Sequence, residues 1–597
     1  MTRKCSSSPA VHPSELRPAL RSTSVAAVVA ALVGVSAASM ALAQEDTSTA
    51  QQVQALKSQV DELQRRLDAL QGKLATRSQT PSAPQAKQTA AASHATRRPQ
   101  TQQTAATPSE ASEPPHVQPI ALASSEADSQ QSSTEPGGYG SATSSGPGLQ
   151  AGPLLITVGG FTELAIIDRH HTEYADVGSV PFSSIPFPDA EQWNVSEFRE
   201  SARQSRFSLL TQADPWNGAR AEAYFETDFL GAAPTANSRE SNSYNLRMRV
   251  FYARFMLDSG FQILAGQNWS LATLYKKGLD ARQEDVPLTI DAQYVAGFNW
   301  TRNPQLRFVQ KFGDIFSLGF SAESPQAVVN ATNNVPATST SGGTLSAYPS
   351  NALYSVTPSS ASGLLDNATS YTIDSAPDLI LKAALDPGYG HYEIYGLQRW
   401  FRSAVGTDTN TVSASSIGGG AILPVVADVF SFQASGLVGK GVGRYGSAQL
   451  PDVTLEPNAT FSPLKGYQLL FGAFVKPIPS LQIYGYAGRE QVSANYFEGT
   501  ISNAGVPTLY AYGYGNPLYN NSGCYTLGGK CVGNPQTVEE LTGGFWWKYY
   551  HGQLGNLQLG LQFAYNQLNA FYADKGGAPS TNVFETMVSF RYYPYQK

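Results

Sequence analysis

Charged residues and cysteine are scarce in this 597-residue sequence, and long apolar runs are absent beyond its first 43 residues. Asp, Glu, Lys and Arg make up only 14% of the chain, and the modest net charge of −6 argues against a nucleic-acid partner. No apolar run approaches the roughly 18–20 residues that a membrane-spanning helix needs. No phosphate-binding glycine loop or clustered cysteine metal site is visible, so we expect no cofactor and no metal ion.

Histidine is also sparse, and its positions argue against an enzyme. An outer-membrane phospholipase would need a serine, a histidine and a polar orienting group together at the lipid face. The histidines after residue 43 lie outside the middle of any expected strand, at positions 94, 116, 170, 171, 391 and 551. The adjacent His170 and His171 could bind a metal, but solvated loop histidines are the simpler interpretation. We therefore predict no catalysis.

Three segments precede the main domain. Residues 1–43 are typical of a signal peptide, because basic residues precede an apolar core and Ala41-Leu42-Ala43 forms a small-x-small cleavage site. Residues 44–75 carry a heptad pattern that predicts a coiled coil, and therefore an oligomer of unspecified order. Residues 76–152 are rich in Ser, Thr, Gln, Ala and Pro, which predicts a disordered linker. Cys5 lies in the signal peptide, so export leaves only Cys524 and Cys531, for which a short-loop disulfide is plausible.

From residue 153 to 597 the sequence alternates between short polar–apolar ribbons and turns, which predicts an all-β domain. About 16 strands are expected, near 153–166, 201–213, 219–229, 246–257, 260–268, 304–312, 315–323, 378–386, 390–400, 413–424, 429–438, 466–475, 481–491, 537–549, 554–566 and 582–593. Tight links such as "DPWNG" (214–218) alternate with long segments such as 324–377. This segregation of loop lengths is typical of a 16-stranded antiparallel transmembrane β-barrel, with its short turns and both barrel termini on the periplasmic side.

The strand patterns also indicate which face is inside. "LQLGLQFAYN" (557–566) places Leu, Phe and Tyr on one face and mainly Gln and Asn on the other. In "RAEAYFETDF" (220–229) Glu222, Glu226 and Asp228 share a face, which would be costly in a dry core and cheap along a wet pore. We therefore expect the apolar face to contact lipid. The aromatic "WWKYY" (546–550) and "RYYPY" (591–595) would supply an interfacial girdle.

Four stretches, "ESARQSRFSLL" (200–210), "LRMRVFYARF" (246–255), "LAGQNWS" (264–270) and "NPQLRFVQKFG" (303–313), occur in the order seen in DcaP-like outer-membrane porins, which the whole mature chain resembles. The resemblance implies a homotrimer of 16-stranded barrels passing small anionic solutes, dicarboxylates among them. Lipid and lipopolysaccharide would surround such a barrel. The ending departs from the common pattern, because Gln596 and Lys597 follow the last aromatic residue.

Selectivity would depend on a loop folded into the barrel and facing a basic wall. The segment 269–297 is the candidate constriction loop, with Lys276, Lys277 and Arg282. Alternation turns several basic side chains inward, so the predicted pore-lining residues are Arg206, Arg247, Arg249, Arg307 and Arg591. Such guanidinium groups bind carboxylates with two hydrogen bonds and attract anions.

Alternatives remain open at each level. The loop could be a surface or trimer-contact loop, and the arginines could pair with Glu222, Glu226 and Asp228 and stiffen the barrel. The protein could be a barrel-anchored structural or adhesive protein, with the coil gripping the peptidoglycan of the cell wall. It could also be a sugar-selective porin, for which Tyr484 and Tyr486 are compatible.

Overall fold

The computed structural model describes residues 148–175, 180–231, 245–330, 348–349, 351–356, 371–503 and 506–594. The predicted signal peptide, the coiled coil and residues 76–147 of the predicted linker lie outside these ranges. The described part of the chain contains no helix long and apolar enough to span a membrane.

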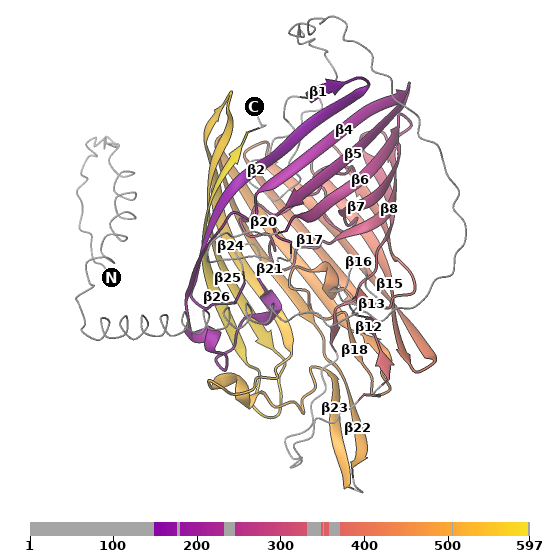
Figure 1. Cartoon of the computed structure of the whole chain (residues 1–597), viewed down its shortest axis with the longest axis vertical. Helices are drawn as coiled ribbons and strands as arrows, with labels where there is room; N and C mark the ends of the chain where they lie inside the picture. Colours follow the sequence, from indigo (N-terminus) through magenta and orange to yellow (C-terminus); the bar gives the residue numbers. More distant parts are fainter. Residues whose placement is uncertain are drawn as a thin grey trace, which may run out of the picture. The chain divides into compact units, whose positions relative to one another are not determined.

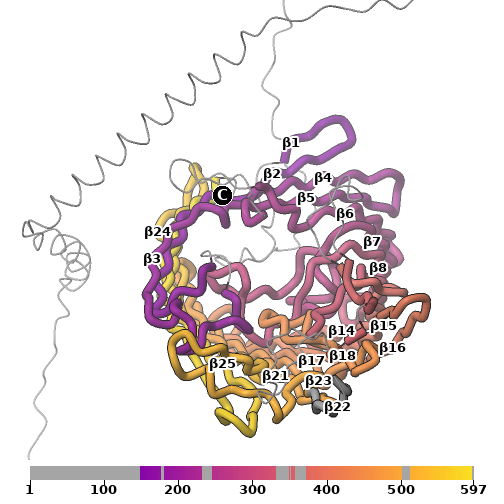
Figure 2. The backbone as a smooth tube through the Cα atoms, turned by 60° about the horizontal axis from the view of Figure 1, so that its bottom comes forward, coloured from indigo at the N-terminus to yellow at the C-terminus, as the bar shows by residue number. Residues whose placement is uncertain are grey.

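The described chain forms a closed antiparallel barrel of sixteen strands (Figures 1 and 2). In chain order these are β2 (Leu154–Arg169), β3 with β4 (Glu197–Ser201 and Arg206–Trp216), β5 (Ala219–Asp228), β6 (Arg247–Leu257), β7 (Phe261–Trp269), β8 (Arg302–Phe312), β9 (Phe316–Glu323), β14 (Asp378–Leu385), β15 (His391–Val405), β16 (Asp408–Val426), β17 (Phe430–Lys440), β20 (Lys465–Ile478), β21 (Leu481–Val492), β24 (Pro535–Gly552), β25 (Gly555–Ala570) and β26 (Ser580–Tyr593). The first strand closes the ring by pairing with the last, from Thr162 opposite Tyr592 to Arg169 opposite Glu585. Each predicted strand corresponds to one of these strands, so the predicted barrel is confirmed.

The link lengths alternate as expected, with one exception. The turns β4–β5 and β6–β7 are tight, and each uses a glycine at positive φ, Gly218 at 84° and Gly260 at 85°. Long links gather at the opposite end of the barrel, where the hairpin of β22 (Asn495–Asn503) and β23 (Val506–Tyr514) projects (Figure 1). The link between β15 and β16 also lies at that end, yet it contains only residues 406 and 407.

Short strands decorate the barrel. β1 (Gly148–Ala151) pairs antiparallel with β2, so these last residues of the predicted linker belong to the sheet. At the end with the long links, β10 (Val329–Asn330), β18 (Val453–Leu455) and β19 (Phe461–Pro463) form a small sheet, β11 (Ala352–Leu353) pairs with β15, and β12 (Ser355–Val356) pairs with β13 (Tyr371–Thr372). Their backbone hydrogen bonds give the long links defined structure.

The strand faces follow the predicted sense. On β25, Phe563 and Tyr565 are exposed on the outside, whereas Gln562 and Asn566 are fully buried inside. On β24, Trp547 points outward as expected for the aromatic girdle, but Trp546 is buried in the interior. The burial of Trp546 indicates that protein side chains fill this part of the interior.

Candidate functional site

The interior is filled mainly by the segment 270–301, which connects β7 to β8 and runs inside the ring of strands (Figure 2). Nearly all its apolar side chains are buried, among them Leu271, Tyr275, Ile290 and Tyr294 at 0% exposure. This is the segment predicted as the constriction loop. Its burial inside the barrel distinguishes it from an ordinary surface loop.

Wall carboxylates hold the backbone of this loop. On one side, Glu323 of β9 accepts the amide N–H of Leu271 (2.8 Å) and Glu393 of β15 accepts that of Tyr275 (3.1 Å). Lys382 of β14 donates to two loop carbonyls and pairs with Glu393 at 2.6 Å. Because ionised acceptors make strong hydrogen bonds to N–H groups, this side of the loop is firmly fixed.

The far part of the loop is hydrogen-bonded to strands about half-way round the ring from β7. Glu490 of β21 accepts the N–H of Gly297 (2.8 Å), and Glu540 of β24 accepts that of Ala296 (2.9 Å). The Tyr486 hydroxyl accepts the N–H of Leu288 (2.9 Å). The loop therefore bridges opposite walls of the barrel.

Three of the five predicted pore-lining arginines form one ion-pair network with Glu226 and Asp228. Arg249 pairs with Glu226 at 2.6 Å and with Asp228 at 3.1 Å, and Arg247 pairs with Asp228 at 2.7 Å. Arg206 lies 3.7 Å from Glu226. This is the pairing that the stiffening alternative describes for Glu226 and Asp228. Four guanidinium-bearing wall residues are at most 4% exposed, namely Arg206, Arg249, Arg307 and Arg591, whereas Arg247 is half-buried.

The other two wall arginines have different partners. Arg591 pairs with Glu163 of β2 at 3.1 Å and lies over the Trp546 ring, 4.2 Å from its centroid. Arg307 donates to the carbonyl of Trp269 and to the hydroxyl of Tyr275 in the loop. These two side chains therefore fix the barrel closure and the loop, respectively.

The predicted basic residues of the loop lie in three environments. Lys277 is exposed and Lys276 is half-buried. Arg282 reaches Glu222 at 3.4 Å and lies over the ring of Tyr224. Asp280 of the same loop is half-buried, with 29% of its side chain exposed. Desolvation alone would raise its pKa, but Arg254 and Lys311 outweigh this effect and the pKa lies below its usual value.

A cavity of about 230 Å³ opens near the short turns β16–β17 and β20–β21. Its charged lining residues are Lys276 and Asp285 of the loop, Asp428 of a turn and Lys476 of β20. Apolar side chains such as Phe474 and uncharged polar ones such as Gln482 line the rest. Lys276 is thus the one predicted site residue in this cavity, which could hold a small solute.

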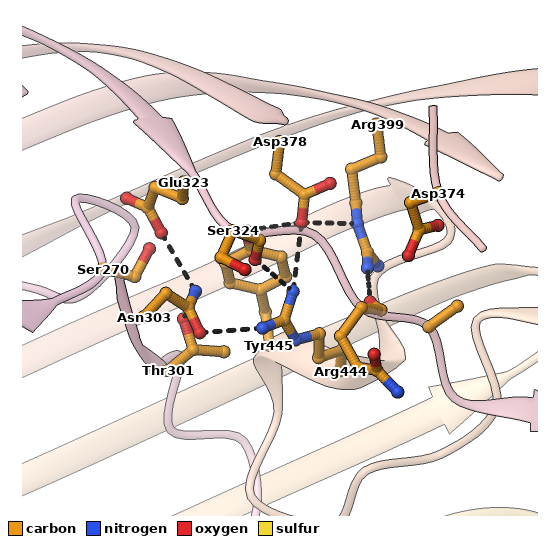
Figure 3. Close-up of polar contacts among 12 residues, drawn as sticks. Ser270, Thr301, Asn303, Glu323, Ser324, Asp374, Asp378, Arg399, Arg444 and Tyr445 are labelled. Carbon is orange, nitrogen blue, oxygen red and sulfur yellow. Dashed lines mark hydrogen bonds and ion pairs between the residues drawn. The ribbon is translucent and has the colours of Figure 1, made fainter. Parts of the chain in front are cut away.

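A second polar cluster at the ends of β8, β9, β14 and β15 was not predicted (Figure 3). Asp378 accepts from Arg399 (3.1 Å), from Tyr445 (3.0 Å) and, at 3.4 Å, from Arg444, which also donates to Asn303 at 2.7 Å. Arg399 also reaches Asp452 at 2.7 Å. The inward position of Arg399 could have been found from the alternation along β15, whereas Arg444 lies in an irregular link with no periodic signal.

Cys524 and Cys531 are joined by a disulfide in the link between β21 and β24, as the sequence predicts. The adjacent His170 and His171 lie in the first long link. The described residues contain no group of three His, Cys, Asp or Glu side chains that could hold a metal ion, there or elsewhere. His171 instead stacks on Trp193, with ring centroids 4.8 Å apart.

No family model matches the chain, and no curated protein matches it. The barrel is similar to the crystal structure of the outer membrane channel DcaP of Acinetobacter baumannii, with a TM-score of 0.51 and 16% identity over 75% of this chain and 99% of that one. Lower TM-scores relate it to an anion-selective porin from Comamonas acidovorans (0.39; 11% identity; 74% of this chain, 99% of that one) and to OmpT, an outer membrane protein of Vibrio cholerae (0.38; 8%; 74% and 99%). The predicted resemblance to DcaP is therefore confirmed as a likeness of fold.

Proposed function

We propose that this protein is an outer-membrane porin through which small, mainly anionic solutes diffuse passively. The observation that carries the proposal is the loop 270–301 inside a closed sixteen-stranded barrel, hydrogen-bonded to Glu490 and Glu540 on the far wall. A loop held across the lumen narrows a channel without blocking it, and the width and charge of that constriction determine which solutes pass. The exposed apolar outer face supports a lipid environment.

A preference for anions is supported by the balance of charge on the wall formed by β4, β5, β6 and β8. Two carboxylates, Glu226 and Asp228, are shared there among the guanidinium groups of Arg206, Arg247 and Arg249. Arg302 lies on the same wall and forms no ion pair with a described residue. Paired charges still contribute to the field of the lumen, and the excess is positive. Dicarboxylate-like solutes suit such a wall because guanidinium groups bind carboxylates bidentately.

The assembly that we propose is a homotrimer in the bacterial outer membrane, surrounded by lipid and lipopolysaccharide. The periodic segment 44–75 supports an oligomer, and the resemblance to DcaP-like porins supports a trimer. Short turns and both barrel termini would face the periplasm, where the coiled coil could also contact peptidoglycan.

A barrel that only anchors a surface protein is the second candidate. It is favoured by the burial of Arg206, Arg249 and Arg591, because a buried, paired wall adds stiffness without attracting a solute. A sugar-selective porin has less support, since Tyr484 and Tyr486 are 3% and 2% exposed and so offer no open stacking surface.

Reconstitution into planar bilayers under a salt gradient tests the proposal. We expect stepwise conductance with a reversal potential that favours anions. A cation-favouring reversal potential would refute the preference for anionic solutes but would still be consistent with a porin. The absence of any conductance from correctly folded barrels would favour the anchor.

A further inference from the structure

Arg302, at the start of β8, differs from every other arginine discussed above. Its guanidinium carbon lies 5.0 Å from the ring centroid of Trp269 and 5.1 Å from that of Trp300. Those two indoles are themselves 5.8 Å apart, and Tyr294 packs edge-on against Trp300. The side chain therefore lies against an aromatic cluster, which favours a cation through the ring quadrupoles.

No carboxylate neutralises this guanidinium within the described part of the chain. The side chain of Arg302 takes part in no ion pair or hydrogen bond there, and its buried Nη1 atom has no partner. Burial disfavours its charge most, and Arg249 and Arg247 disfavour it further, whereas Tyr294 and Asp228 favour it. Both neighbouring arginines already bind that carboxylate, at 3.1 and 2.7 Å.

A cation that is removed from water without a partner is costly, and two like charges nearby increase the cost. The aromatic contacts offset only part of it, since a cation–π contact contributes about 0.5–2 kcal/mol. The Nη1 atom is buried, but the residue as a whole is only half-buried, so part of the side chain is open to solution. An anion arriving from solution would remove this imbalance.

We propose that Arg302 is the binding residue for a small carboxylate solute. This inference deepens the proposed function and rests on it. The planar fork of arginine matches the two oxygens of a carboxylate, and the indoles of Trp269 and Trp300 flank that fork with apolar surface. The half-buried Arg247, with 32% of its side chain exposed, adds a second positive charge near the bound anion. Arg206, Arg249 and Arg591 then hold the wall together, while Arg302 contacts the solute.

Intrinsic tryptophan fluorescence of the purified full-length protein in detergent tests the site, because Trp269 and Trp300 lie against Arg302. Succinate is titrated at constant ionic strength, with chloride and sulfate in parallel titrations. We expect a saturable change with succinate, and a dissociation constant at least about tenfold larger in Arg302→Gln, as loss of a charge-assisted hydrogen-bond pair implies. Arg302→Lys keeps the charge but loses the fork, and should weaken succinate binding at least several-fold.

Arg402→Gln is the matched control, since Arg402 is a half-buried strand arginine on β15 that donates to the Thr411 hydroxyl. Succinate binding equal to wild type in both Arg302 variants would overturn the site, as would chloride competing as well as succinate. A sulfate affinity equal to that of succinate would overturn the carboxylate assignment. Binding and conductance separate the two proposals, because Arg302-dependent binding without conductance would refute the channel alone, and anion-selective conductance without such binding would refute the site alone.

Discussion

Single buried charges in this barrel are stabilising only together with their partners. Glu226 is fully buried, and its carboxylate receives Arg249 at 2.6 Å and the Tyr224 hydroxyl at 2.9 Å. Substituting Glu226→Gln removes the negative charge that compensates Arg249, which is itself buried. We expect the free energy of unfolding to fall by about 3 kcal/mol, measured by urea unfolding in detergent micelles.

The exposed pair of Asp214 and Arg220, at 3.4 Å beside the β4–β5 turn, provides the control. Asp214→Asn should change the free energy of unfolding by less than about 1 kcal/mol, because exposed ion pairs contribute little. Equal effects of the two substitutions would contradict the view that burial of Glu226 and Arg249 makes their ion pair structural.

Asp291 of the loop predicts a dependence of stability on pH. Burial raises the pKa of this carboxyl to about 7, although Gln562 donates to it at 3.1 Å. Between the unfolded pKa, about 4, and about 7 the folded state holds a proton that the unfolded state has lost, so raising the pH through this window reduces stability. We expect Asp291→Asn to remove that component, measured as unfolding free energy at a series of pH values. An unchanged pH profile in the variant would assign the dependence to another group.

At the scale of single residues, the sequence predicts which face of a strand a side chain lies on, but not which residue it pairs with. Alternation correctly turns Arg206 and Arg591 inward, because side chains on a strand point to opposite faces. It cannot predict that Arg591 pairs with Glu163, since their strands are joined only by closure of the ring. Alternation does not predict the orientation of Arg302, because this residue lies at the end of β8, opposite a part of β7 that no longer pairs with β6.

Among the elements, the strands were predictable and the interior of the barrel was not. Each strand carries its own period-two pattern, and glycines such as Gly218 and Gly260 mark the tight turns. The two-residue link at 406–407 was missed because Thr409, Asn410 and Thr411 look like loop residues although they belong to β16. The course of the segment 270–301 depends on carboxylates from strands distant in sequence, which no local pattern contains.

The loop 270–301 gives the prediction that belongs to this scale. Glu490 Oε1 accepts N–H groups from Gly297 (2.8 Å) and from Ala448 (2.9 Å), so it ties two links to β21 at once. Glu490→Ala removes both bonds and leaves the N–H groups unpaired, which should loosen the loop. We expect larger and noisier single-channel conductance in planar bilayers.

The isosteric Glu490→Gln is the matched variant, because its amide oxygen can still accept both N–H groups. It should conduct nearly as wild type does. If alanine and glutamine gave the same conductance, the tether would have no part in shaping the channel.

For the whole molecule, barrel formation should be independent of the segments that precede it. All sixteen strands and the closing register of β2 with β26 lie between Leu154 and Tyr593, and the apolar outer face needs lipid rather than another domain. We expect a chain that retains residues 1–43 but lacks 44–147 to fold in the outer membrane. Its band on a denaturing gel should shift on boiling, as that of a folded barrel does.

The same deletion separates the two possible sources of oligomerisation. If the barrel faces hold the oligomer, chemical cross-linking in intact cells should yield the same species with and without residues 44–147. If the heptad segment 44–75 holds the oligomer, cross-linking of the shortened chain should yield no oligomer and leave only monomers, because the Val and Leu contacts of that segment would be gone. Failure of the shortened chain to reach the heat-modifiable state would contradict the claim that the described strands contain all the information for closure.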